Sequence, residues 1–227
     1  MRSTLLSTFC FVPKNGNVHV FPTSNKNVRL NIQREKNLRK IIVTTWITLD
    51  GFIAGPNGEM NWIMVDQTMG QYEDDLVSSA DTLILGRVTY QSFAGSWPHV
   101  PENPSVSEGE KEYARKLNSM RKIVFSKSLE KAEWNNSQLM KEVLPEEIAR
   151  MKQEPGKDMV IYGSASIVQA FTNLGLIDEY QLLVHPVVLG SGKPLFAGIA
   201  KPAHLKLLQT KSFPSGVIGL YYAPQSK

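Results

Sequence analysis

The chain has 227 residues, of which 42% are hydrophobic and 20% charged, a composition typical of a globular protein with a full hydrophobic core. Residues 1–40 hold eight basic residues and one acidic residue, whereas the rest of the chain holds 17 basic and 20 acidic residues. The globular part is therefore mildly acidic, which excludes a nucleic-acid-binding face. No apolar run approaches the ~20 residues of a membrane-spanning helix, so no membrane partner is expected.

The cysteine, the histidines and the first 39 residues give little indication of function. Cys10 is the one cysteine and cannot form a disulfide within the chain, which favours a reducing, cytoplasmic location. The four histidines are scattered without ligand spacing, so no metal site is predicted. Residues 1–39 lack hydrophobic periodicity and the apolar segment of a secretory signal. They indicate a disordered or mis-started leader, with an organellar transit segment as the alternative.

From Lys40 onward, strand-like and helix-like segments alternate. Strands are predicted at residues 41–49, 82–85, 122–126 and 159–162, and β-rich segments at 179–185, 204–213 and 217–223. Helices are predicted at residues 67–80, 88 to about 93, 108–118, from 145, and 164–174 up to a Gly175 cap, with a loop over 95–107. This order predicts an α/β fold of three layers, with a mostly parallel central sheet and antiparallel C-terminal strands.

Two apolar runs, residues 81–85 and 158–162, end at glycines, Gly86 and Gly163, each followed by a polar residue that opens a helical pattern. Such a turn lets a phosphate reach the backbone and the free N–H groups of the helix. Two of them, one carrying Arg87 and Thr89, suggest two contacts with one dinucleotide. The alternatives are ordinary strand–helix turns, a solvated Arg87, and a Thr89 hydroxyl that serves only its own helix.

Seven ordered motifs carry a resemblance to a known superfamily. They are Leu49–Ala54, Met60–Trp62, Leu85–Tyr90, Arg121–Ser126, Val160–Ser164, Leu176–Glu179 and Pro186–Phe196. With these motifs, residues 40–224 resemble the dihydrofolate reductase-like superfamily, and most closely the reductase domain of bacterial riboflavin biosynthesis, the RibD C-terminal domain family. The resemblance implies a dihydrofolate reductase-like reductase domain over residues 40–227.

The resemblance implies NADPH as the hydride donor. It places the 2′-phosphate on Arg87, whose fork-shaped cation suits a phosphate, and the pyrophosphate at the two glycine turns. The nicotinamide would lie along the turn after Leu49, with the Ile53 backbone on its carboxamide. The implied cofactor-binding residues are Ile53, Ala54, Gly86, Arg87, Thr89, Ser126, Lys127, Tyr162, Gly163 and Ser164. A cis Tyr162–Gly163 peptide bond is also implied.

On the substrate side, the resemblance implies Asp50 beside the nicotinamide, Trp62 as a pocket wall and Asp66 as a carboxylate that grips the substrate. The alternatives are a plain Asp-Gly turn, a core tryptophan, and an Asp66 that lies one position out of register. Riboflavin reductases usually carry a lysine and a glutamate where this chain has Thr44 and Tyr162, so the substrate groups depart from that pattern.

The sequence therefore predicts an NADPH-dependent oxidoreductase that acts on a small heterocyclic substrate and resembles 5-amino-6-(5-phosphoribosylamino)uracil reductase. The alternatives are a dihydrofolate or pterin reductase, and a non-catalytic nucleotide-binding module. A homodimer is expected, because relatives are commonly dimers and the C-terminal strands present more apolar residues than one helix layer covers. These residues are Leu183, Val187, Leu205, Leu207 and Leu220.

Overall fold

A computed structural model describes residues 38–225, which lie within one unit of the chain, Leu38–Lys227. The predicted leader lies outside the described residues except for its last two positions. Of these, Arg39 is only 5% exposed, forms an ion pair with Asp81 and donates a 2.7 Å hydrogen bond to the Thr82 hydroxyl. The packed structure therefore includes the guanidinium of Arg39, one residue before the predicted boundary at Lys40.

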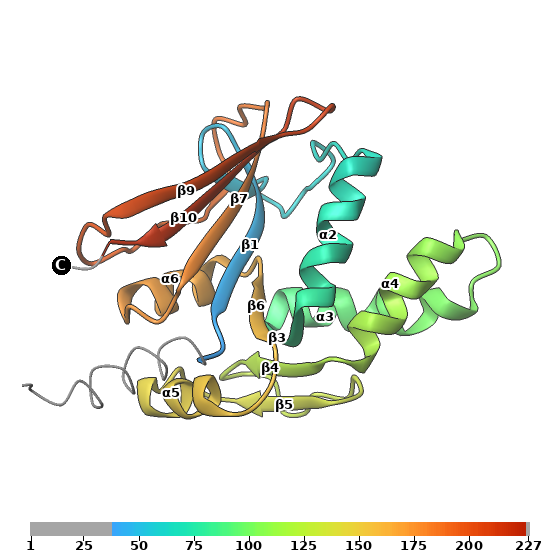
Figure 1. The fold of residues 1–227 in the computed structure, drawn as a ribbon, viewed down its shortest axis with the longest axis horizontal. Helices are drawn as coiled ribbons and strands as arrows, with labels where there is room; N and C mark the ends of the chain where they lie inside the picture. The colour runs from blue at the N-terminus through green and yellow to red at the C-terminus, as the bar shows by residue number, and fades with distance from the viewer. Residues whose placement is uncertain (1–37, 226–227) are drawn as a thin grey trace, which may run out of the picture. The chain divides into compact units, whose positions relative to one another are not determined.

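Within the described residues, eight strands form the central sheet in the order β5-β4-β3-β6-β1-β7-β10-β9 (Figure 1). The first six are parallel, and β10 runs antiparallel to β7 and β9. The strands are β1 Ile41–Thr48, β3 Ala80–Gly86, β4 Arg121–Phe125, β5 Ser137–Met140, β6 Asp158–Tyr162, β7 Glu179–His185, β9 Leu205–Ser212 and β10 Ile218–Pro224. A two-stranded ribbon pairs β2, Phe52–Ala54, with β8, Lys193–Pro194.

Helices cover both faces of this sheet. They are α2 Gln67–Ser79, α3 Arg87–Ser96, the 3₁₀ helix η1 Trp97–Glu102, α4 Glu108–Ser119, α5 Pro145–Gln153 and α6 Ala165–Asn173. Leu76, Tyr90 and Leu117 bring α2, α3 and α4 to one core cluster, while Ile148 and Phe171 bring α5 and α6 to the other (Figure 1). The three-layer α/β fold is confirmed. None of the described helices is long and apolar enough to cross a membrane.

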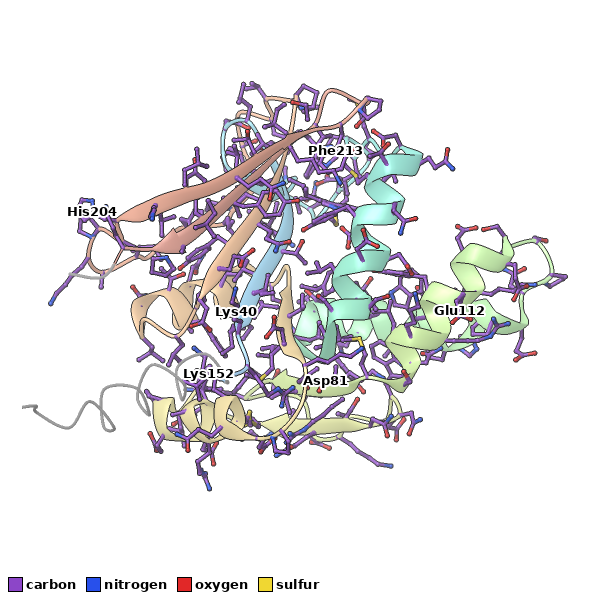
Figure 2. All side chains as sticks on the ribbon, viewed as in Figure 1. Lys40, Asp81, Glu112, Lys152, His204 and Phe213 are labelled. Atoms are coloured by element: carbon purple, nitrogen blue, oxygen red, sulfur yellow. The ribbon has the colours of Figure 1, made fainter. Side chains whose placement is uncertain are left out.

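The central strands are apolar throughout because both faces of the sheet are covered. In β3, Leu83 and Leu85 face the cluster of α2, while Ile84 faces the cluster of α6. The turn between β9 and β10 also packs on α2. Figure 2 shows Phe213 beside this helix, and its ring centroid lies 6.1 Å from that of Tyr72. Helix α2 is thus fixed along the sheet, with its apolar stripe turned toward β1 and β7.

All of the predicted strands and helices are present. Strands β2, β5 and β8 are absent from the sequence-based prediction, and η1 lies in a predicted loop. These elements are too short to show periodicity, β5 is partly exposed, and η1 contains Pro98 and Pro101, which look like loop residues in a sequence. The polar connection before β8, with Gly190 and Gly192, enters a strand rather than a helix.

Candidate active site

The two glycine turns lie side by side, because β3 and β6 are neighbours in the sheet. The hydroxyl of Ser164 accepts a 3.0 Å hydrogen bond from the Gly86 N–H and lies 2.6 Å from the Thr89 hydroxyl. We call the segments 86–89 and 163–164 the paired turns. The structure thus brings together the two turns that the sequence singled out, and one serine side chain joins them.

Both helices that follow the paired turns begin without a side-chain cap. Gly86 precedes α3 and Ser164 precedes α6, and neither helix start receives a capping hydrogen bond from a side chain. The first N–H groups of a helix lack partners within the helix, and its dipole makes this end partially positive. Two such ends in adjacent positions suit a ligand with two linked phosphates.

The turn after β6 is made by two consecutive residues in the left-handed region, Gly163 at φ +51° and Ser164 at φ +56°. A side chain added at Gly163 would find only the Thr89 hydroxyl, 4.0 Å away, so this backbone is open to an approaching group. For Ser164 the conformation costs about 1–3 kcal/mol, a cost that recurs at binding sites. The Tyr162–Gly163 bond is trans, so the cis prediction is wrong; the left-handed pair makes the turn instead.

Arg87 is the first residue of α3 and is exposed. Its guanidinium donates a 2.9 Å hydrogen bond to the Gln91 side chain one turn later. Among the described residues it forms no ion pair, so its charge is held by a neutral amide rather than by a carboxylate. A guanidinium in this state keeps donors available for a phosphate.

Ser126 and Lys127 follow β4, the strand next to β3. The Ser126 hydroxyl accepts hydrogen bonds from the N–H groups of Ser128 and Leu129, at 3.2 and 2.9 Å, and so holds its own turn. The Lys127 ammonium is exposed and lies 3.5 Å from Glu142. Both residues stand at the predicted edge of the sheet, but their contacts lie within the β4–β5 side rather than with Arg87.

Asp50 closes the turn after β1 onto the connection between β7 and β8. Its carboxylate accepts hydrogen bonds from the Thr48 hydroxyl at 2.6 Å and from the N–H groups of Leu189 and Gly190 at 3.1 and 2.7 Å. The Thr48 hydroxyl, aided by these amides, lowers the pKa of Asp50. A carboxylate held in this way acts as a clamp and is a poor proton donor at neutral pH.

Ile53 and Ala54 lie in β2, beside this turn. Strand β2 pairs with β8 through Phe52 and Ala54, with a bulge between them. The backbone role of Ile53 stays a prediction. Ala54 is buried, and a side chain at Gly192 would collide with its carbonyl, which explains the glycine in the facing connection.

Trp62 packs edge to face on His185, with ring centroids 5.2 Å apart, and both side chains are buried. The His185 Nδ1 accepts a 3.3 Å hydrogen bond from the Met64 N–H, and burial lowers its pKa, so the neutral ring carries its proton on Nε2. In the described part of the chain, neither this nitrogen nor the Trp62 indole nitrogen has a hydrogen-bond partner. Trp62 is therefore a buried side chain that packs beside His185, the last residue of β7.

Asp66 caps α2 rather than facing the paired turns. Its carboxylate accepts 2.9 Å hydrogen bonds from the N–H groups of Met69 and Ser215, one on each oxygen. The Ser215 hydroxyl and these amides lower its pKa. Its contacts explain Asp66 as the start of a helix and an anchor for the β9–β10 turn, and none of them supports substrate binding.

One carboxylate next to the paired turns was not among the residues predicted from the sequence. Glu73 of α2 accepts a 2.8 Å hydrogen bond from the Tyr162 hydroxyl and a 3.1 Å bond from the Trp46 indole N–H, and the Tyr113 hydroxyl lies 3.2 Å from that of Tyr162. Burial raises the pKa of Glu73. One signal was available: Glu73 falls on the same helical stripe as Met69 and the other apolar residues of α2.

The two positions that depart from the riboflavin reductases are register partners in adjacent strands, Thr44 in β1 and Tyr162 in β6. Both face α2 and bond to consecutive residues of that helix. The Thr44 hydroxyl lies 3.2 Å from that of Tyr72, which donates a 2.6 Å hydrogen bond to Gln181, and Tyr162 bonds to Glu73. Both departures thus lie at the interface of the sheet and α2.

No group of three or more histidine, cysteine, aspartate and glutamate side chains within residues 38–225 is arranged to hold a metal ion.

Comparison with solved structures identifies the fold class as that of dihydrofolate reductase. A dihydrofolate reductase from Enterococcus faecalis, solved with NADP(H) and RAB-propyl, shares 14% identity at a TM-score of 0.54, covering 82% of this chain and 97% of that one. A pyrimidine reductase-like protein from Corynebacterium diphtheriae shares 18% identity at a TM-score of 0.59, covering 85% and 94%. At these identities the likeness establishes the fold.

The sequence itself establishes the family. Residues 39–218 match the RibD C-terminal domain, and the chain belongs to this family. YyaP, an uncharacterized protein of Bacillus subtilis (strain 168), is 39% identical over 184 residues, which cover 81% of this chain and 94% of YyaP. The predicted family is therefore confirmed.

Proposed function

We propose that this protein is an NADPH-dependent reductase that transfers hydride to a small heterocyclic substrate. The observation that carries the proposal is the pair of uncapped helix ends joined by Ser164, with Arg87 on the first turn of one of them. Membership of a reductase family supports the same reaction class. The proposed reaction resembles that of 5-amino-6-(5-phosphoribosylamino)uracil reductase.

Each end of the cofactor has a group that fits it. At the Gly163–Ser164 turn, the Ser164 N–H would bind the pyrophosphate together with the Thr89 hydroxyl, and the Arg87 guanidinium would bind the 2′-phosphate. The Ile53 backbone would bind the carboxamide. The bound cofactor supplies the hydride, and the protein supplies orientation and electrostatics.

The substrate groups favour a heterocycle other than the riboflavin intermediate itself. At the positions of the usual lysine and glutamate, Thr44 and Tyr162 are occupied by hydrogen bonds to α2. A lysine that could bind a phosphate group is therefore absent at position 44. Reduction of a dihydrofolate or pterin remains the second candidate within the same chemistry.

The chain is proposed to act as a cytoplasmic homodimer. Leu207 and Leu208 of the edge strand β9 and Ile218 of β10 are 50%, 51% and 37% exposed. Leu183, which we had included in this face, is fully buried against α2, so the apolar face is narrower than predicted. Light scattering should return about twice the chain mass of 25.4 kDa, and the monomer mass would refute the dimer.

Calorimetric titration of NADPH and NADH tests the proposed function. Arg87→Ala should weaken NADPH binding by about ten- to a hundredfold, the value of a well-formed charge-assisted contact, and leave NADH binding nearly unchanged. Arg150→Ala, at an exposed arginine of α5, is the matched control and should alter neither. Equal losses for the two nucleotides would show that Arg87 does not contact the 2′-phosphate.

Cofactor oxidation in the presence of pyrimidines, pterins and quinones then separates the reductase from a nucleotide-binding module. Oxidation that depends on one of these substrates supports the reductase. Tight NADPH binding without any oxidation supports the module. A wild-type protein that binds neither nucleotide at millimolar concentration would refute both.

A further inference from the structure

We propose that a groove between α3, α4 and the β4–β5 connection is a second ligand site, which binds a planar aromatic carboxylate. The groove has a volume of about 570 Å³, within the range of small-molecule sites. No residue of the paired turns lines it, so the inference goes beyond the proposed reductase function and does not depend on it. We call it the side groove; its lining includes Tyr90, Gln91, Asn118, Lys131, Glu133 and Trp134.

The floor of the side groove is aromatic. Tyr90 and Trp134 are both buried, and their ring centroids lie 6.3 Å apart at an interplanar angle of 44°. Ala94, one turn after Tyr90 in α3, also lines the groove and presents only a methyl group. Flat rings bury apolar area well against such surfaces. The floor therefore favours a planar, aromatic ligand.

The polar groups of the lining have unused donors. The Tyr90 hydroxyl accepts a 2.8 Å hydrogen bond from the Trp134 backbone N–H, and the Asn118 side-chain oxygen accepts a 2.9 Å bond from the Trp134 indole. The Gln91 oxygen accepts a 2.9 Å bond from Arg87. Among the described residues, the Tyr90 O–H, the Gln91 amide N–H groups and one Asn118 amide N–H have no acceptor. Donors of this kind suit the oxygens of a carboxylate.

The charges near the side groove favour an anion over a cation. The buried Lys122 ammonium lies 4.1 Å from the centre of the Trp134 ring and forms no ion pair with any described residue. At the rim, Lys131 and Glu133 form a 3.0 Å ion pair, in which their charges cancel. The remaining local charge is positive, so it attracts a carboxylate and repels an ammonium group.

One side chain connects the side groove to the proposed cofactor site. Gln91 lines the groove and also accepts the hydrogen bond of Arg87, one turn earlier in α3. The two sites adjoin through this contact but share no lining residue, so both ligands can be bound at once. Any effect of one ligand on the affinity of the other must then be reciprocal.

The test titrates 2-naphthoate into the full chain, labelled with nitrogen-15 at its indole groups, and follows the indole N–H signals by NMR. The signal of Trp134, assigned with Trp134→Phe, should shift at millimolar probe, whereas those of Trp46 and Trp62 should not. The cation of 2-naphthylmethylamine has the same rings and the opposite charge, and should bind at least about tenfold more weakly. Cyclohexanecarboxylate, which lacks the flat ring, should also bind more weakly than 2-naphthoate.

Exposed variants test the donors and the charge without disturbing the core. Gln91→Glu keeps the acceptor for Arg87 but replaces free donors with a negative charge, so it should weaken 2-naphthoate binding at least about tenfold. Gln138→Glu is the matched control: this exposed glutamine also accepts a hydrogen bond from an arginine, lies outside the groove and should bind the probe as the wild type does. Glu133→Gln removes the carboxylate of the rim and should tighten binding by up to about fivefold.

The outcomes separate this inference from the proposed function. An unshifted Trp134 signal, or equal affinity in the wild type and Gln91→Glu, would overturn the side groove as a site for carboxylates. Saturating NADPH should leave the probe bound, and its displacement would show that the groove belongs to the cofactor site instead. Probe binding that depends on Gln91, in a protein that binds no NADPH, would support the side groove and refute the reductase.

Discussion

At the carboxyl edge of the sheet, the paired turns and the Glu73 cluster lie next to each other but are built differently. Each paired turn consists of residues that are consecutive in sequence, a strand end, a glycine and the first residues of a helix. The Glu73 cluster consists of one residue from each of four elements: Trp46 of β1, Glu73 of α2, Tyr113 of α4 and Tyr162 of β6. A local motif can be recognised in one sequence, whereas a cluster assembled from four elements becomes visible only once those elements are packed.

The largest expected effect is that of a substitution at Gly163, in the paired turns, which are local in sequence. Gly163→Val should reduce the affinity for both NADPH and NADH by more than about a hundredfold, because a β-branched residue is strained at φ +51° and fills the space between the two helix ends. Calorimetry measures both constants. Gly95→Ala, a glycine of α3 with no atom near its added Cβ, should bind both nucleotides normally. Retained affinity in Gly163→Val would remove the paired turns from the cofactor site.

Lys122 is a buried ionisable residue away from the carboxyl edge of the sheet. Its substitution tests whether a buried charge outside the candidate site affects stability alone. Lys122, near the amino end of β4, is fully buried, donates a 2.6 Å hydrogen bond to the Asn118 carbonyl and lies 4.1 Å over the Trp134 ring. Burial lowers the pKa of Lys122 to about 8. Lys122→Met should raise the free energy of unfolding at pH 7 by about 1–3 kcal/mol, because the cost of the buried ammonium disappears.

The sign of the pH dependence follows from that lowered pKa. Between about pH 8 and the ordinary lysine value of 10.5, the unfolded chain binds more protons, so wild-type stability rises with pH. Urea denaturation at pH 7 and pH 10 should therefore show a gain for Lys122→Met that shrinks at the higher pH. NADPH affinity should stay unchanged. A variant less stable than the wild type at pH 7 would mean that the hydrogen bond and the Trp134 contact outweigh desolvation.

Asp50 combines a local partner, Thr48, with the distant partners Leu189 and Gly190, and its variants distinguish a clamp from a proton donor. Removing a general acid costs about a hundred- to ten-thousandfold in rate, whereas we expect Asp50→Asn to lose less than about tenfold in kcat. Thr48→Val breaks the same clamp without changing the carboxylate, so both variants should raise the KM for NADPH alike. A large kcat loss in Asp50→Asn alone would restore the proton-donor role.

The difference between the two halves also explains what sequence reasoning could predict. The order of strands and helices, the three layers and the side-by-side glycine turns follow from periodicity and from the rule that parallel strands end at one edge. The roles of Asp50 and Asp66 could not be separated by type, because an aspartate that clamps a turn or caps a helix looks the same in sequence as a catalytic one. Only the hydrogen-bond partners in the folded protein, such as Gly190 for Asp50 and Ser215 for Asp66, distinguish these roles.

Arg39 and Glu73 show a second limit. The basic composition of the first 40 residues masked Arg39, whose burial depends on Asp81 and Thr82, more than 40 positions away. Glu73 interrupts an apolar stripe, and the pattern alone leaves open whether such a residue is exposed or paired. Its hydrogen bonds come from Trp46 and Tyr162, which lie 27 and 89 positions away. Long-range pairing of polar groups is therefore the part of the site that periodicity does not encode.

The smallest expected effect is that of a substitution at Glu73, in the cluster whose members are distant in sequence. Because burial raises the pKa of Glu73, the folded protein binds a proton there more tightly than the unfolded chain does. Wild-type stability should therefore fall as pH rises from the ordinary glutamate value of 4.5 through the raised folded value, and then level off. Glu73→Gln lacks this loss, so its free energy of unfolding relative to the wild type should increase over that range.

Urea denaturation in steps from pH 4 to pH 8 measures this difference, with Asp75→Asn as the control that follows the wild type. The neighbouring Tyr72, Tyr113 and Tyr162 all have raised pKa values, so Glu73 is the member of the cluster that titrates in this range. A Glu73→Gln variant that loses stability as pH rises would mean that the ionised carboxylate stabilises the fold. Glu73 would then belong with Asp50 and Asp66 as a structural clamp, and the contrast between the two halves would disappear.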